Sequence, residues 1–265
     1  MTTTAYATAR GGHYGLRQAA RMEWIKLRSL RSTTYALLLT AFGMITMGVV
    51  TMANTKAPRG AEKIASFDPT NNVLAGVALG QLIVGALGVL VITGEYSSGT
   101  IRSTLAAVPD RRLALTAKAA VFGGLALVVG EVVTFVTFLA GRAALAADVP
   151  HPSLGDPDVL RAVLLSGAYL ALVGLMGIGV GAITRHTASA IGALVGLLFV
   201  LPALLAGTTG TAVAKFFPTI IMGNSLGVSV PVDGVLSPWA GFAVLCLYPA
   251  VLLAVGGGLL VRRDA

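Results

Sequence analysis

The chain has 265 residues, of which 55% are hydrophobic and only 11% are charged. An ordinary soluble domain carries roughly a quarter charged residues, so the composition excludes an ordinary water-soluble fold. The net charge of +8 would suit a nucleic-acid partner only if the cations clustered on a soluble element beside base-reading side chains. Here they flank apolar runs, and we expect no nucleic-acid partner.

Six apolar stretches are long enough to cross a bilayer, which takes about 20 helical residues. Five contain runs of 18 to 23 residues without a charge, and the sixth contains one acid, Glu131. We therefore predict an all-α membrane protein with one six-span domain over residues 34–265 and a tail over residues 1–33. The expected spans are 35–53, 73–93, 119–140, 161–183, 188–207 and 239–261.

The cations are distributed unevenly between the two sides of these spans. Thirteen Lys and Arg residues fall on the side of the tail, of segment 94–118 and of the C-terminal end, and six fall on the other side. Because short cytoplasmic loops collect Lys and Arg, we expect both termini and segment 94–118 to be cytoplasmic.

Residues Gly15 to Arg31 follow a helical pattern. Leu16, Ala20, Leu27 and Leu30 fall in one sector of the helix, and the cations Arg17, Arg21 and Arg28 fall together in another. Such a helix lies in the membrane interface with its cations toward lipid headgroups, which makes lipid a partner. It is either a basic topology anchor or a lever that joins the cytoplasmic face to the first span.

The longest polar island is Gly94 to Lys118, "GEYSSGTIRSTLAAVPDRRLALTAK". A short helix can begin near the capping residues Ser97 or Ser98 and must end before Pro109. Ile101, Leu105 and Val108 then share a face, with Arg102 beside them. This face can rest on lipid or dock in a groove of a cytoplasmic partner, and the residues alone favour neither.

Glu131 lies within the third span, where a charge is costly unless it is protonated, paired or facing water. Thr134 and Phe138 share its helix face. These three residues are candidates for a polar patch on a translocation path. The alternative is an ordinary hydrogen bond between helices or a protonated acid.

Segment 208–238 is apolar but interrupted by residues such as Lys215 and Pro218, so a continuous membrane helix would be costly there. We predict a re-entrant or broken segment on the outer side. Phe216, Phe217 and Ile220 are candidates for an apolar lid, with ordinary packing as the alternative.

No catalytic constellation stands out along the chain. There is no phosphate loop of the form G-x-x-x-x-G-K-[ST], no His-Glu-x-x-His and no Gly-x-Ser-x-Gly. His13 and His186 fall on one expected side and His151 on the other, so we expect no metal site. We also expect no enzyme activity and no bound cofactor.

Three features resemble ABC-2-type exporter permeases, particularly the small bacterial kind: the basic helix "RMEWIKLRSLRS" that runs into the first span, segment 94–118, and the apolar broken segment 208–238 before the last span. The resemblance implies that Leu16 to Arg31 is a connecting helix and that segment 208–238 is the extracellular re-entrant part. It also implies that Glu95 lies at the membrane end of the cytoplasmic loop. In the same way it implies that Thr100 to Leu105 form a coupling helix flanked by Arg111 and Arg112.

The resemblance further implies the function of a permease subunit in an ATP-driven exporter. ATP and Mg would be bound by a separate cytoplasmic ATPase subunit, and the path would be formed with a second permease copy, either identical or related. The alternative is a membrane scaffold or sensor that recruits a cytoplasmic protein without moving cargo. No residue identifies the cargo.

Overall fold

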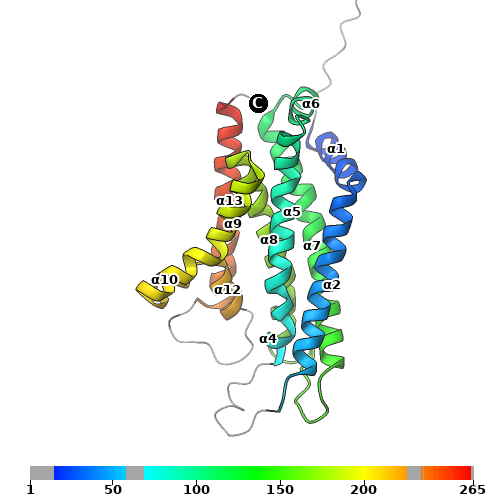
Figure 1. Ribbon diagram of the computed structural model, residues 1–265, viewed down its shortest axis with the longest axis vertical. Coiled ribbons are helices and arrows are strands. Elements are labelled where there is room, and N and C mark those ends of the chain that lie inside the picture. The colour runs from blue at the N-terminus through cyan, green and yellow to red at the C-terminus, as the bar shows by residue number, and fades with distance from the viewer. Residues whose placement is uncertain (1–14, 58–68, 226–233, 235, 264–265) are drawn as a thin grey trace, which may run out of the picture.

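The computed structural model describes residues 15–57, 69–225, 234 and 236–263, and this part is helical without strands. It contains six helices long and apolar enough to cross a membrane, which confirms the predicted number of spans. Apart from the second half of the fifth, which turns away from the bundle, they run roughly along the long axis of the molecule (Figure 1). They are Arg31–Ala53, Pro69–Ser97, Arg111–Ala143, Val159–Thr184, Thr187–Thr208 and Pro238–Arg262.

Several of these spans are composite. The first is α2 (Arg31–Ala53), and the second joins α4 (Pro69–Val73), η1 (Leu74–Gly76) and α5 (Val77–Ser97). The third is α7 (Arg111–Ala143) and the fourth is α8 (Val159–Thr184). The fifth joins α9 (Thr187–Val195), the π-helical η2 (Gly196–Val200) and α10 (Leu201–Thr209), and the sixth is α13 (Pro238–Arg262).

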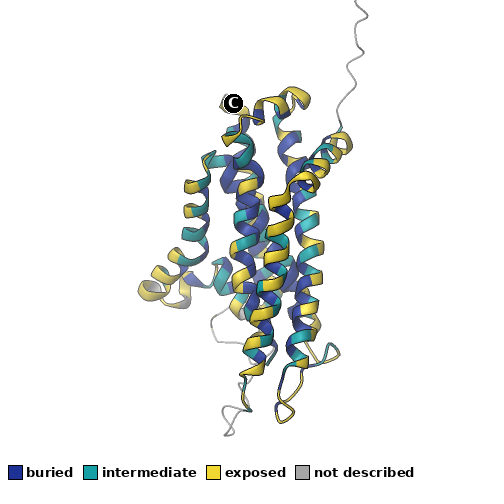
Figure 2. Cartoon of the chain, turned by 45° about the vertical axis from the view of Figure 1, so that its right-hand side comes forward, coloured by how far each residue is buried: buried dark blue, intermediate teal, exposed yellow. Residues whose placement is uncertain are grey.

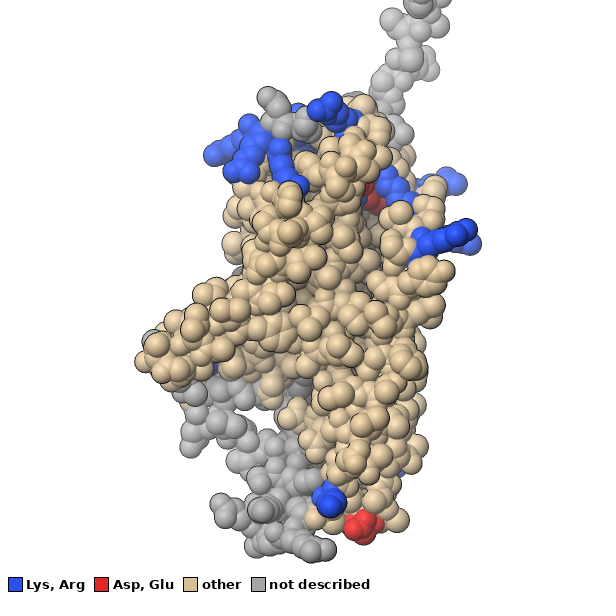
Figure 3. Space-filling model, viewed as in Figure 1, with Lys and Arg blue, Asp and Glu red and all other residues tan. Residues whose placement is uncertain are grey.

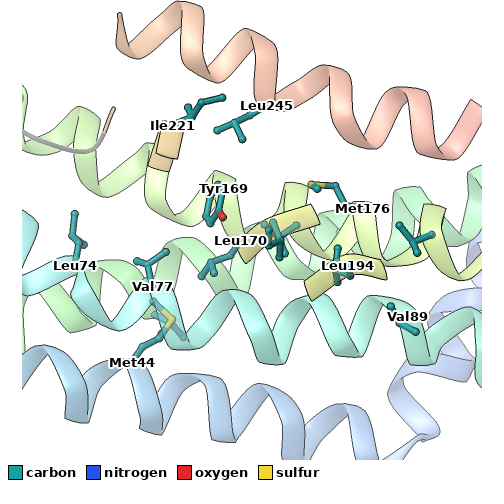
Figure 4. Packing of buried hydrophobic residues seen from close by; sticks show 14 of the residues in the cluster. Met44, Leu74, Val77, Val89, Tyr169, Leu170, Met176, Leu194, Ile221 and Leu245 are labelled. Atoms are coloured by element: carbon teal, nitrogen blue, oxygen red, sulfur yellow. The ribbon is translucent and has the colours of Figure 1, made fainter. Parts of the chain in front are cut away.

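Helix α8 is the central element of the bundle. It is the most completely buried of the six and packs against α5, α7 and α13. Its side chains Tyr169, Leu170 and Met176 lie in one cluster with residues of α2, α5, α9, α12 and α13 (Figure 4). The exposed residues of α2 and α7 lie on their outer faces (Figure 2), as expected of helices that contact lipid.

Glycines allow α8 to approach its neighbours at backbone distance. A Cβ added to Gly88 of α5 would lie 2.0 Å from the Gly174 carbonyl oxygen, and one added to Gly177 would lie 2.4 Å from that of Gly85. Association in lipid depends on such close packing. The sequence predicts close helix contacts at three glycine pairs with four-residue spacing. Gly76 and Gly80 do pack against Met44 of α2, and Gly177 and Gly181 against α5, but a Cβ on Gly192 or Gly196 would meet nothing within 4 Å of the chain.

The turn after α5 differs from the prediction. Ser97 and Ser98 do not begin the next helix; their hydroxyls donate to the Gly94 carbonyl at 3.1 and 2.7 Å and so help to end α5. Gly99 then takes φ +72°, and α6 spans Ile101–Ala107. As predicted, α6 ends before Pro109.

Helix α7 begins eight residues before the expected span. The Asp110 side chain accepts hydrogen bonds from the backbone N–H groups of Arg112 and Leu113, at 2.9 and 3.1 Å, and caps the helix at Arg111. The polar stretch up to Lys118 is therefore the first two turns of α7, which places Lys118 at a fixed position on a rigid helix.

Helix α1 (Leu16–Ser29) buries a different face from the predicted one. Ala19, Glu23 and Leu27 are buried, whereas Leu16 and Leu30 are about half exposed. Of the predicted apolar sector, only Leu27 is fully buried. The cations Arg17, Arg21 and Arg28 are exposed, as the interfacial helix requires.

Segment 208–238 is broken, as predicted. It contains the end of α10, the short helices α11 (Thr211–Ala214) and α12 (Pro218–Ser225), and residues 226–233, which lie outside the described residues together with tail residues 1–14. Helix α10 projects from the bundle, and α12 packs beside α13 (Figure 1). Phe216 is exposed, and Phe217 and Ile220 are partly buried.

We predict that Gly88→Ala destabilises the bundle by about 3 kcal/mol, because its methyl group would meet backbone that cannot move aside. Gly124→Ala on the exposed side of α7 is the matched control: a Cβ there meets nothing within 4 Å, and the higher helix propensity of alanine alone would stabilise the helix by up to about 1 kcal/mol. Thermal unfolding in detergent, followed by tryptophan fluorescence, measures both. Equal melting temperatures would contradict the close contact between α5 and α8.

Candidate functional site at the charged end of the bundle

Cations gather at the upper end of the molecule, and the long middle zone carries none on the visible face (Figure 3). At this end α1, α6, the end of α5 and the beginning of α7 meet. Four charged side chains and one threonine connect them, and we call these five residues the ionic junction: Glu23, Lys26, Glu95, Thr104 and Lys118.

Lys118 forms the buried half of the junction. Its Nζ lies 2.5 Å from Glu23 Oε2 on α1 and 2.7 Å from Glu95 Oε1 on α5. The three side chains are 5%, 2% and 11% exposed. Removing one member of a buried pair leaves an uncompensated charge and costs about 3–5 kcal/mol, so these contacts hold three helix ends in one arrangement.

Lys26 extends the junction to α6. Its Nζ lies 3.0 Å from Glu23 Oε1, 3.0 Å from Glu95 Oε1 and 2.8 Å from the Thr104 hydroxyl oxygen, to which it donates. Burial alone would lower the pKa of Lys26, but the carboxylates of Glu23 and Glu95 outweigh it and hold the pKa above its ordinary value. Lys26 is therefore charged at neutral pH.

The two lysines and two glutamates neutralise each other within the junction. Such compensation allows four charges to lie at a helix junction with little water. The sequence prediction included Glu95 alone among these five as a site residue. Two signals for Glu23 are present in the sequence, the scarcity of acids on the cationic side and Lys26 three residues on, but its buried partner Lys118 lies 95 positions away.

Helix α6 is attached to the bundle through its apolar face. Ile101 and Val108 are buried, and Leu105 packs with Ala19 of α1 and Ala114 of α7. The face that the sequence offered for lipid or for a partner is thus occupied within the chain. The opposite face is exposed, and it comprises Arg102, Ser103, Ala106 and Ala107, with Thr100 at its start.

The two arginines that follow α6 differ in their contacts. Arg111 Nη1 donates to the carbonyl oxygens of Leu260, at 2.8 Å, and Arg263, at 2.7 Å, at the end of α13. A cation at a helix C-terminus satisfies carbonyls that lack partners in the helix. Arg112, in contrast, is exposed.

Glu131 lies in a close crossing of α7 and α8. A Cβ added to Gly167 would lie 2.6 Å from Glu131 Cδ, and one added to Gly130 would lie 2.8 Å from the Gly167 carbonyl oxygen. Its Oε2 is buried and has no hydrogen-bond partner among the described residues. Thr134 and Phe138 are fully buried, and Phe138 belongs to a cluster with Met52 and Val163. A path along this face would require α7 and α8 to separate.

The described residues hold no group of three His, Cys, Asp or Glu side chains that could bind a metal ion. The fold and the junction define an all-helical, multi-pass membrane protein whose short amphipathic helices are tied to the ends of its spans. A family model for ABC-2 family transporter proteins matches residues 19–201. The chain belongs to this family, the membrane subunits of transporters whose nucleotide-binding domain is a separate part. No curated protein matches the chain.

We predict that Glu23→Gln lowers the stability of the chain by about 3 kcal/mol, because it leaves Lys26 and Lys118 with one carboxylate between them. Asp158→Asn is the matched control, since the Asp158–Arg161 pair is a surface pair with a half-exposed carboxylate and should contribute less than about 1 kcal/mol. Thermal unfolding in detergent compares them. Adding Lys118→Met to Glu23→Gln should restore part of the loss; an unaffected single variant would refute the junction's structural role.

Proposed function

We propose that the chain is the permease subunit of an ATP-driven exporter and that its charged end faces the cytoplasm. The orientation is supported by the collection of Lys and Arg at that end (Figure 3). Both termini would then be cytoplasmic, and a separate ATPase subunit would bind ATP and Mg. Membership of the ABC-2 family supports a partner ATPase in general.

The observation that carries this proposal is the attachment of α6. One side of α6 is held to α1 and α7 by apolar contacts and to Lys26 through Thr104, while the other side is exposed. A partner that moves the exposed side would therefore move α1 and the ends of α5 and α7 with it. In this proposal α6 is the coupling helix, α1 is the connecting helix, and Arg102 and Ala106 contact the ATPase.

The proposed extracellular roles rest on hydrogen bonds of the broken segment 208–238, at the end of the bundle opposite the charged end. Tyr248 of α13 donates to the Phe216 carbonyl at 3.0 Å, and Thr219 donates to the Leu198 carbonyl at 2.6 Å. These bonds tie the broken segment to the fifth and sixth spans and support its assignment as an extracellular re-entrant part. Phe216, Phe217 and Ile220 remain the proposed lid, and Glu131, Thr134 and Phe138 the proposed path residues.

We predict that Arg102→Glu abolishes stimulation of ATP hydrolysis by the permease without lowering its melting temperature, because Arg102 is exposed and lies opposite the buried face of α6. Lys56→Glu, an exposed charge reversal near the other end of α2, is the control. The measurement uses the chain co-purified with its ATPase from native membranes. Hydrolysis that never depends on the permease, despite stable binding, would favour the scaffold or sensor instead.

A second copy is supported by the fifth span. Gly192 and Gly196 have the four-residue spacing of close helix pairs, yet a Cβ on either would meet nothing within 4 Å. Their neighbour Ala193 is exposed. We propose that this face of α9 contacts the same face of a second permease, so that two chains together provide twelve spans.

In a Cys246→Ser background, we predict that Ala193→Cys forms a disulfide-linked dimer under mild oxidation in membranes. Cys246 is the only native cysteine, so every cross-link is assigned to the new position. Gly124→Cys on the exposed side of α7 is the control and should remain monomeric on non-reducing gels. Equal cross-linking at both positions would indicate random collision and would remove α9 from the interface.

A further inference from the structure

A groove of about 370 Å³ lies between α7 and α13 near the charged end. Leu115, Thr116 and Ala119 of α7 form one wall, and Leu253, Ala254 and Gly258 of α13 are part of the other. The lining is mostly apolar. Ala119 lies seven residues beyond Arg112, and at 1.5 Å rise per residue the groove extends about 10 Å from that cation toward the membrane interior.

Two arginines lie at the charged end of this groove. Arg112 lines it, and a neighbouring pocket of about 280 Å³ shares Arg112 and Gly258 and adds Arg262. Both side chains are exposed, and neither forms an ion pair with an acid in the described part of the chain. The mouth is rigid, because Arg111 holds the end of α13 against the beginning of α7.

Gly258 has no packing reason to be glycine. In the run Gly256 to Gly258, a Cβ on Gly256 would lie 2.9 Å from Ala182 of α8 and one on Gly257 would lie 3.5 Å from Leu115, but one on Gly258 would meet nothing within 4 Å. Glycine in a helix costs about 1 kcal/mol relative to alanine. At Gly258 the missing side chain keeps the groove open rather than bringing two helices together.

We propose that this groove binds one anionic phospholipid, with its phosphate at Arg112 and Arg262 and an acyl chain along the apolar walls. An apolar groove of membrane depth that ends in two cations matches an amphiphile with a negative headgroup. Basic pockets between membrane helices on the cytoplasmic side are typical of anionic headgroup sites. That the lipid belongs to the cytoplasmic leaflet rests on the orientation given under the proposed function. The match between an anionic lipid and this groove does not depend on that orientation.

The test is a titration of the purified, delipidated chain with single phospholipids, read by native mass spectrometry. We expect phosphatidylglycerol to bind more tightly than phosphatidylethanolamine with the same acyl chains. Arg112→Gln and Arg262→Gln should each weaken phosphatidylglycerol binding about fivefold and together remove the preference. Gly258→Leu should block the groove to both lipids, and Gly124→Leu, which also meets open space, should change nothing.

Three results would overturn the proposal. The first is equal affinity of phosphatidylglycerol for the original chain and the double arginine variant. The second is lipid binding unchanged by Gly258→Leu, which would place the headgroup on the general cationic surface. The third is a lipid-independent dimer that Gly258→Leu dissociates, which would place a second copy in the groove. The assay contains no ATPase, so loss of ATPase stimulation and loss of lipid binding are distinguishable.

Discussion

The structure depends on backbone contact along α8. Helices in lipid gain nothing from hydrophobic burial against one another, so close packing must hold them. Glycines on α8 and its partners bring α5 and α7 to distances at which a single methyl group would collide with a carbonyl, as at Gly88–Gly174 and Gly130–Gly167. The central helix and these two neighbours therefore behave as one body, and the remaining elements are defined by how they attach to it.

The ionic junction is the attachment at the charged end. Two of its five residues, Glu95 and Lys118, belong to α5 and α7 of this body, two belong to α1, and Thr104 belongs to α6. Because the charges are compensated and largely buried, separating α1 or α6 would expose opposite charges that lose their partners. The junction gives two short helices, neither of which would be stable alone, a fixed position on the end of a rigid bundle.

Length and apolarity were sufficient to predict the six spans, because a bilayer imposes one helix length on every segment. Length and apolarity were insufficient to predict where the helices begin and which faces they bury at the charged end. There α7 begins at Arg111 rather than near residue 119, since the charge of Lys118 is compensated by acids of α1 and α5 that no local pattern reveals. The buried face of α6 was misjudged in the same way: Ile101, Leu105 and Val108 form an apolar stripe in the sequence, but only tertiary packing decides that α1 and α7 cover it.

The fifth span departs from the glycine-packed body. Gly196 to Val200 are π-helical and Pro202 follows, so the regular hydrogen-bond ladder is interrupted where α10 begins to project from the bundle (Figure 1). No glycine of α9 or α10 is in close contact with another helix. A transporter that alternates between two states needs a rigid body and an element that can change its angle to it. Under the proposed exporter function, α8 with its neighbours would be the rigid body, and the interrupted helix from α9 to α10 would be the element that changes its angle.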